Sequence, residues 1–189
     1  TLLYTPFARE AFVFIVNADN PVNSLTEQQV RDIFSGAITN WRAVGGNDQE
    51  IQTWQRPEDS GSQTVMQSQV MKNVRMISPQ ETKVASVMEG MIKVVAEYRN
   101  TNNAIGYTFR YYATQMNADK NIKLLAINGI TPTAENIRNG KYAYIVDAFM
   151  VTRENTTSET QKLVEWFLTP QGQSLVEDVG YVPLYPTME

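Results

Sequence analysis

The sequence EAFVFIVN at residues 10–17 is a run of aromatic and β-branched residues in which polar and apolar positions do not alternate. Such a run is typical of a strand that is buried on both faces. The Asp-Asn-Pro at residues 19–21 ends the run, because proline cannot continue a hydrogen-bonded strand. We therefore expect the chain to build its core around this strand.

Helical and strand-like segments alternate along the rest of the chain. Thr26 and Gln29 predict a capping box at the start of a helix that stops near residue 36, and Ser60 and Gln63 predict a second box for a helix over 60–72. Further strands are expected at residues 50–55, 103–108, 122–127 and 142–152, and further helices at 85–98, 110–116, from 158, and from 170 to 180. This alternation predicts the α/β class.

The composition limits the chemistry that this chain can perform. Of its 189 residues 42% are hydrophobic and 19% are charged, which is ordinary for a globular protein. The net charge of -4 argues against a general binder of nucleic acid or anionic membrane, because such proteins present a broad basic surface. The chain has no cysteine and no histidine, which removes Ser-His and Cys-His catalysis and nearly all zinc and copper sites. Any anion site must therefore be local, and no metal or cofactor is expected.

The sequence QRPEDSGSQT at residues 55–64 places hydrogen-bond donors where a strand ends and a helix begins. A helix start exposes backbone N–H groups without internal partners, together with partial positive charge. Gly61 lets a ligand approach the backbone, Ser60 and Ser62 add hydroxyl groups, and Arg56 can close the cup with a charged fork. These groups predict a site for a tetrahedral oxyanion.

Two other interpretations of this stretch stand beside the anion site. Serine is common at helix starts because it stabilises them, so the stretch could be an ordinary cap. The adjacent carboxylates of Glu58 and Asp59 count against an anion and raise the hypothesis of a hydrolase. Adjacent residues in an extended or loop segment generally point apart, however, so we expect no catalytic residues and no enzyme.

Five short motifs occur in a fixed order along one part of the chain. They are NADNP at 17–21, IFSG at 33–36, NW at 40–41, GG at 45–46, and the Arg ahead of SGS at 56–62. Together they resemble the signature region of PstS-like phosphate-binding proteins of ABC transporters, within the type II periplasmic binding proteins. AIGY at 104–107 and the C-terminal helices extend this similarity over nearly the whole chain.

The resemblance implies a fold and a division of the chain. It implies an α/β lobe of the type II periplasmic binding protein kind, with a mixed, mostly parallel sheet flanked by helices. Residues 17–140 would form this second lobe, which is the phosphate-binding half. Residues 1–16 would be a crossing strand from the first lobe, and 141–189 the returning strand with the C-terminal helices of that lobe. The family's N-terminal first-lobe segment has no counterpart here, so the chain looks like a C-terminal portion.

The resemblance also implies a function and its residues. The chain would be an extracytoplasmic solute-binding protein that binds inorganic phosphate for an ABC importer, with Arg56, Ser60, Gly61 and Ser62 as ligand contacts. Position 62 usually carries threonine in this family, and serine keeps the hydroxyl. Asp59 is a further candidate as the acceptor for a phosphate proton, and Tyr107 is a further candidate to line the cleft.

The partners and alternatives follow from the same resemblance. The expected partners are phosphate and the permease of an ABC transporter, with no nucleic acid, and a membrane is reached only through a lipid anchor or that permease. A receptor for another oxyanion such as sulfate or molybdate is an alternative, and so is a sensor or interaction domain that has lost transport. Apolar surface on the crossing strands also predicts self-association or a compensating repacking.

Overall fold

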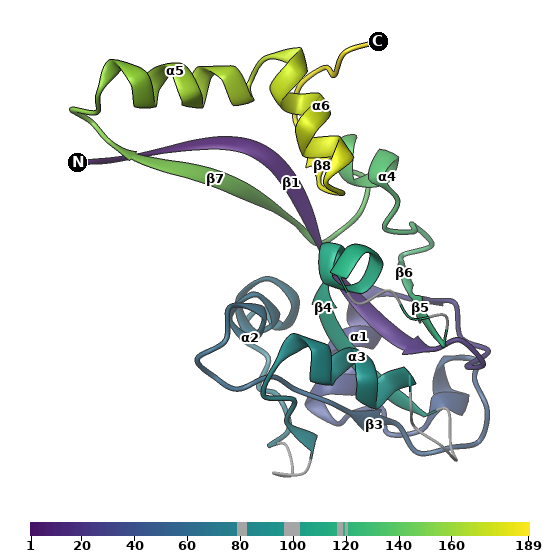
Figure 1. Ribbon diagram of the computed structural model, residues 1–189. Helices are drawn as coiled ribbons and strands as arrows, with labels where there is room; N and C mark the ends of the chain where they lie inside the picture. The colour runs from purple at the N-terminus through teal and green to yellow at the C-terminus, as the bar shows by residue number, and fades with distance from the viewer. Residues whose placement is uncertain (79–82, 97–102, 117–118, 120) are drawn as a thin grey trace.

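The central element of the fold is one long strand that serves two sheets. The computed structural model describes residues 1–78, 83–96, 103–116, 119 and 121–189. The first half of β1 (Leu2–Asn17) pairs with β7 (Ile145–Arg153) and β8 (Val182–Pro183). The second half lies between β4 (Ala104–Phe109) and β5 (Ile122–Leu124) and continues into the lower body of Figure 1.

The change of partner along β1 occurs within one residue step. Ala11 still pairs with Ile145 of β7, and Phe12 already pairs with Phe109 of β4. The strand predicted at 10–17 is confirmed, and it begins earlier than predicted, at Leu2. The earlier half lacks a continuous apolar run, so its strand conformation depends on pairing with β7 rather than on a buried pattern.

The sheet is mixed, as predicted, but the expectation that it is mostly parallel was wrong. Its order is β3-β4-β1-β5, where β3 (Gln52–Thr53) runs parallel to β4, and β2 (Ser24–Leu25) pairs in parallel with β6 (Ala126–Ile127) apart from it. Among the described residues, the other four strand pairings all involve β1 and are antiparallel. β4 and β5 point the same way, and β1 inserts between them from the opposite direction, which makes each of its ladders antiparallel.

The helices follow the predicted pattern with local differences. They are α1 (Glu27–Ser35), the 3-10 turn η1 (Trp41–Val44), α2 (Gly61–Val65), α3 (Met88–Ala96), α4 (Ala134–Arg138), α5 (Ser158–Phe167) and α6 (Pro170–Asp178). α2 continues as the π-helical η2 (Met66–Met71), and a second π-helical segment, η4 (Tyr112–Met116), stands where a helix over 110–116 was predicted.

The boundaries of four predicted elements needed correction. The strand predicted at 50–55 is only two residues long in β3, and that at 122–127 is divided into β5 and β6. The strand predicted at 142–152 begins at residue 145. The helix predicted at 85–98 begins at residue 88, and residues 97 and 98 lie outside the described part of the chain. The short elements β2, β8 and α4 were not predicted, because two to five residues carry too little periodicity.

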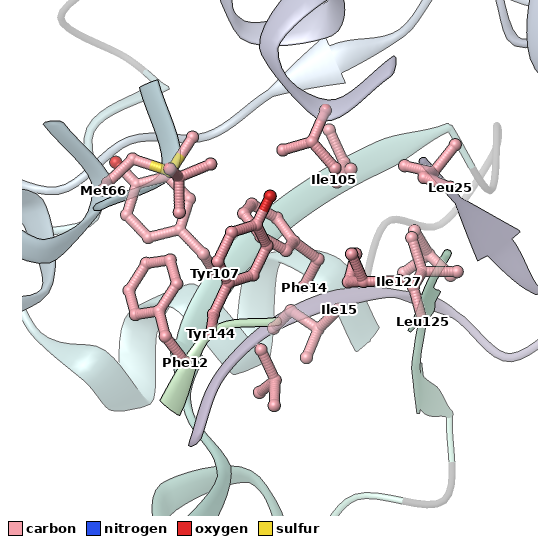
Figure 2. Packing of buried hydrophobic residues seen from close by; sticks show 14 of the residues in the cluster. Phe12, Phe14, Ile15, Leu25, Met66, Ile105, Tyr107, Leu125, Ile127 and Tyr144 are labelled. Atoms are coloured by element: carbon pink, nitrogen blue, oxygen red, sulfur yellow. The ribbon is translucent and has the colours of Figure 1, made fainter. Parts of the chain in front are cut away.

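The core lies around the second half of β1. Phe12, Phe14 and Ile15 are fully buried, and their neighbours across the ladder include Tyr107 of β4. Figure 2 shows the rings of Phe12, Phe14 and Tyr107 grouped together, with Met66 of η2 beside Tyr107. This aromatic group fixes the position of Tyr107 on β4, next to the candidate site.

The ribbon formed by the first half of β1 and by β7 contrasts with this core. Figure 1 shows it leaving the main body, with α5 running along it. Leu2 and Tyr4 are 52% and 62% exposed, and α5 has no buried residue. Within the described residues, no helix is long and apolar enough to cross a membrane.

Candidate functional site

The turn between β3 and α2 carries the residues that the sequence singled out. Ser60 is the N-cap of α2, and its Oγ accepts the N–H of Gln63 at 3.1 Å. The predicted capping box forms only in this half. The N–H of Ser60 donates to the Pro57 carbonyl at 3.0 Å, and the Gln63 side chain turns into the protein. The start of the helix was therefore predicted correctly, and the role of Gln63 was not.

The guanidinium of Arg56 lies over this helix start. Arg56 is 8% exposed, and its Nε donates to Ser62 Oγ at 3.2 Å while its Nη1 donates to the Ala85 carbonyl at 2.6 Å. Ser60 Oγ and Ser62 Oγ are 3.4 Å apart. The structure thus brings together Arg56, Ser60 and Ser62. Burial lowers the pKa of Arg56, and the charge of Asp59 opposes that shift. An arginine guanidinium stays protonated in proteins, so the group is a cation.

Backbone donors complete the same side of the turn. Within the described part of the chain, the N–H groups of Gly61 and Ser62 have no hydrogen-bond partner. Gly61 is exposed, and apart from its chain neighbours and the backbone of its own helix no atom lies within 4 Å of the position that a Cβ would take there. A small anion can therefore approach the peptide of Gly61 directly, whereas Ser62, which is fully buried, lies behind it.

The buried side chains of Tyr107 and Gln63 accept the peptide N–H of Arg56. The peptide N–H of Arg56 donates to the Tyr107 hydroxyl oxygen at 3.0 Å and approaches Gln63 Oε1 at 3.3 Å, and the Tyr107 hydroxyl donates to the same Oε1. Tyr107 is fully buried, so it lies behind Arg56 rather than at the surface of the turn. Sequence reasoning gave Gln63 no part in the site, and its place in a capping-box pattern was the one available signal.

The two carboxylates of the turn are exposed. Glu58 and Asp59 both face solvent, and of the two the charge of Asp59 is the one that acts on Arg56. Across the described ranges, no group of three or more Asp, Glu, His or Cys residues is placed to hold a metal ion. The donors of the turn are thus accompanied by one neighbouring carboxylate, Asp59, which can accept a hydrogen bond from the hydroxyl of a protonated anion.

A cavity beside the turn shares only Arg56 with this donor set. A cavity of about 550 Å³ borders Arg56 and Glu58 and extends along Gln67 and Arg75. Ser60, Gly61 and Ser62 are not among its lining residues. The hydroxyl and peptide donors therefore face a different side of Arg56, and the geometry of the donors, rather than the volume of the cavity, defines the candidate site.

Comparisons with known proteins identify the family of this chain. A family model described as the PBP superfamily domain matches residues 1–171. The chain belongs to this superfamily. Similar members include the phosphate-binding protein PstS of Bacillus subtilis, 28% identical over 170 residues, and PstS of Borreliella burgdorferi, 26% identical over 181 residues. The resemblance drawn from the motifs is thereby confirmed.

Solved structures of the superfamily show the same architecture. A phosphate ABC transporter substrate-binding protein from Clostridium perfringens, whose structure holds phosphate, matches with a TM-score of 0.78 at 26% identity. That match covers 96% of this chain and 72% of the other. The chain spans 53% of the length of the Bacillus subtilis relative and 64% of the Borreliella burgdorferi relative. The α/β fold of type II periplasmic phosphate-binding proteins is thus confirmed for the part that this chain spans.

Proposed function

We propose that this chain binds inorganic phosphate as part of a solute-binding protein of an ABC importer. The observation that carries the proposal is the convergence of Arg56, the hydroxyls of Ser60 and Ser62, and the peptide N–H groups at Gly61 and Ser62 on one turn. All of these groups can donate to an oxyanion, and Arg56 supplies the charge. The names of the similar proteins, which are phosphate-binding proteins, support phosphate as the anion.

The role of each group follows from its position. Arg56 retains donors beyond those given to Ser62 and Ala85, and these can bind two phosphate oxygens as a fork. Gly61 and Ser62 offer peptide N–H groups, and Ser60 and Ser62 offer hydroxyls. Asp59 is the acceptor that we propose for the proton of hydrogen phosphate, because a set of donors alone does not separate phosphate from sulfate.

The wider setting is part of the same proposal. The expected boundary at residue 17 moves to Phe12, because β1 pairs with β4 and β5 from Phe12 onward, so residues 12–140 form the proposed phosphate-binding lobe. Residues 1–11 and 141–189 belong to the other lobe, and closure of the two lobes retains the ligand. The protein acts outside the cytoplasm, delivers phosphate to the permease of the transporter and catalyses no reaction. No cofactor is required, because hydrogen bonds and one charge suffice for binding.

Calorimetric titration of the chain with phosphate and then with sulfate tests this proposal. Saturable binding that prefers phosphate is the expected result, and it should be lost in Arg56→Ala. Binding that prefers sulfate would favour the alternative hypothesis, a receptor for another oxyanion. A chain that binds neither anion but binds a protein partner would favour the sensor or interaction domain, and it would overturn the proposal.

Self-association is a second expected property, and it concerns the ribbon of β1 and β7. Leu2 and Tyr4 on β1 and Phe149 and Val151 on β7 are all about half exposed, at 52%, 62%, 49% and 51%. Tyr4 pairs with Val151, so these side chains stand together on one face of the ribbon. Exposed apolar faces of this kind favour association. Sedimentation velocity over a wide concentration range should show the sedimentation coefficient rising, and a constant monomer value would contradict this expectation.

A further inference from the structure

We propose that Tyr107 and Gln63 are positioning residues of the anion site, which together hold the peptide of Arg56 and the first turn of α2 in one arrangement. This inference rests on the proposed function, because it gives two more residues a task in the same site. It assigns neither residue a contact with the ligand. Both act through Arg56 and through the start of the helix.

The first step of the argument is the peptide N–H of Arg56. The last backbone N–H before Arg56 that donates to β4 is that of Trp54, which bonds the Ile105 carbonyl at 2.9 Å. Arg56 is 8% exposed, and a buried peptide N–H without an acceptor is costly. Two side chains supply the acceptors that the sheet no longer offers, Tyr107 Oη at 3.0 Å and Gln63 Oε1 at 3.3 Å. The direction of the Arg56 peptide is therefore set by side chains.

The second step is the way in which Gln63 joins two segments. Its Oε1 accepts the Tyr107 hydroxyl, its Nε2 donates to Gln55 Oε1 at 3.4 Å, and its peptide N–H donates to Ser60 Oγ. A capping box would have used this side chain for the N–H of Ser60, which bonds Pro57 instead. One residue of α2 thus ties the helix start to the end of the strand, and the two parts of the donor set cannot shift independently.

The third step is the rigidity of the Tyr107 ring. The ring is fully buried, and its centroid lies 5.4 Å from that of Phe12, 5.6 Å from Phe34 and 6.2 Å from Phe14. Figure 2 shows Tyr107 beside Phe12 and Phe14, with Met66 on its other side. Burial raises the pKa of Tyr107, so its hydroxyl keeps the proton that it donates to Gln63. A fixed ring therefore presents a fixed hydroxyl to Arg56.

The test removes only this hydroxyl and compares it with a matched control. Tyr107→Phe is the test variant, and Tyr142→Phe is the control, because Tyr142 is also buried and its hydroxyl donates to the Phe12 carbonyl at 2.9 Å and not to Gln63. Gln63→Met removes the same contact from the other side and serves as the second test variant. For each protein, NMR measures hydrogen exchange at the Arg56 amide, and calorimetry measures phosphate affinity.

The expected pattern is local. Tyr107→Phe and Gln63→Met should speed exchange at the Arg56 amide relative to the other core amides and weaken phosphate binding about threefold to tenfold. Tyr142→Phe should change neither value, although it loses a buried hydrogen bond as well. Uniform acceleration of all core amides in the three variants would reduce Tyr107 and Gln63 to ordinary core residues and overturn the inference.

The two proposals fail in different ways. If the unsubstituted chain binds phosphate, and Tyr107→Phe leaves both Arg56 exchange and affinity unchanged, the positioning role is wrong and the proposed function stands. If the unsubstituted chain does not bind phosphate, while exchange at Arg56 still responds to Tyr107→Phe and not to Tyr142→Phe, the proposed function fails and the positioning of Arg56 stands.

Discussion

The starts of α1 and α2 carry the same local pattern and use it differently. Each helix begins with a hydroxyl residue that is followed three positions later by glutamine, Thr26 with Gln29 and Ser60 with Gln63. At α1 the box closes: Thr26 Oγ1 accepts the N–H of Gln29 at 3.0 Å, and Gln29 Oε1 accepts the N–H of Thr26 at 2.9 Å. At α2 only the serine half forms, because Gln63 is buried and directed to Arg56.

Under the proposed function, this difference separates a helix start that only stabilises its helix from one that also binds an anion. The box of α1 is exposed, and the next peptide N–H, that of Glu27, is satisfied by Asn128 Oδ1 at 3.2 Å. At α2 the peptide donors of Gly61 and Ser62 have no partner in the described part of the chain. The same hydroxyl-x-x-Gln pattern can thus leave the first peptide donor of a helix satisfied, as at Glu27, or without a partner, as at Gly61, and the neighbouring side chains decide which.

The largest expected effect comes from removing the charge over α2. Arg56→Ala should weaken phosphate binding about tenfold to 150-fold for each charge-assisted hydrogen bond that it removes, since such a bond contributes about 1.5–3 kcal/mol. Arg31→Ala is the matched control, because Arg31 also donates to a backbone carbonyl, that of Val70 at 3.4 Å, but lies on α1. Equal affinities of the two variants in calorimetric titration would remove Arg56 from the site.

The next largest expected effect is the difference in stability between the variants Gln63→Met and Gln29→Met. Gln63→Met leaves the N–H of Arg56 and the side chain of Gln55 short of a buried partner, and it should lower the free energy of unfolding by about 1–3 kcal/mol. Gln29→Met opens an exposed box and should cost no more than about 0.5 kcal/mol. Urea denaturation of both variants gives these values, and similar losses would erase the distinction between the two helix starts.

The two hydroxyl caps should cost equal stability and unequal affinity. Thr26→Ala and Ser60→Ala each remove an N-cap, which typically costs about 1 kcal/mol of unfolding free energy. Only Ser60→Ala should also weaken phosphate binding, about threefold to tenfold, because it removes a hydroxyl of the site. If Thr26→Ala weakened binding to the same extent, loss of stability alone would explain both results.

A buried carboxylate at a third helix start gives the smallest effect. Glu10 on β1 accepts the N–H of Tyr111, just before η4, at 3.1 Å and that of Ala11 at 2.7 Å. Burial raises the pKa of Glu10 above its usual 4.5, against these two bonds and the charge of Arg110. The folded state then holds the Glu10 proton more tightly than the unfolded state does. The protonated Glu10 therefore stabilises the fold below pH 4.5, and this contribution is lost as pH rises through the raised pKa.

Glu10→Gln checks that sign directly. The amide keeps an acceptor oxygen and cannot ionise, so the variant should gain on the unsubstituted protein as pH rises from about 4.5, by a few tenths to about 1 kcal/mol. Urea denaturation at several pH values measures the difference. Parallel stability curves for the two proteins would show that the Glu10 carboxylate is not destabilised by burial.

The parts of the fold that the sequence predicted have strong local signals. The apolar run in β1 and the capped, amphipathic α1 are visible within a dozen residues, and both were predicted correctly. The direction of strands is not local. It depends on β1 running between β4 and β5 in the direction opposite to both. The sequence pattern of a buried strand is the same for either direction.

The residues of the candidate site also divide into those that a local pattern predicts and those that distant contacts position. Arg56, Ser60 and Ser62 could be grouped from the sequence because they lie within one turn, where a cap and its donors are neighbours. The partners that hold Arg56 are distant: the Ala85 carbonyl is 29 residues away, and the Tyr107 hydroxyl is 51 residues away. Their positions depend on pairing of β4 with β1 and on the bridge between Gln55 and Val84, which no local pattern encodes.

An NMR titration with phosphate tests the central claim most directly, because it detects even weak binding at named amides. The account predicts saturable shifts at the amides of Gly61 and Ser62 and at the side-chain Nε–H of Arg56, with Thr26 and Glu27 at the start of α1 unchanged. Arg56→Ala should abolish these shifts. Phosphate-dependent shifts that saturate elsewhere, or that affect both helix starts equally, would contradict the assignment of the anion site to the start of α2.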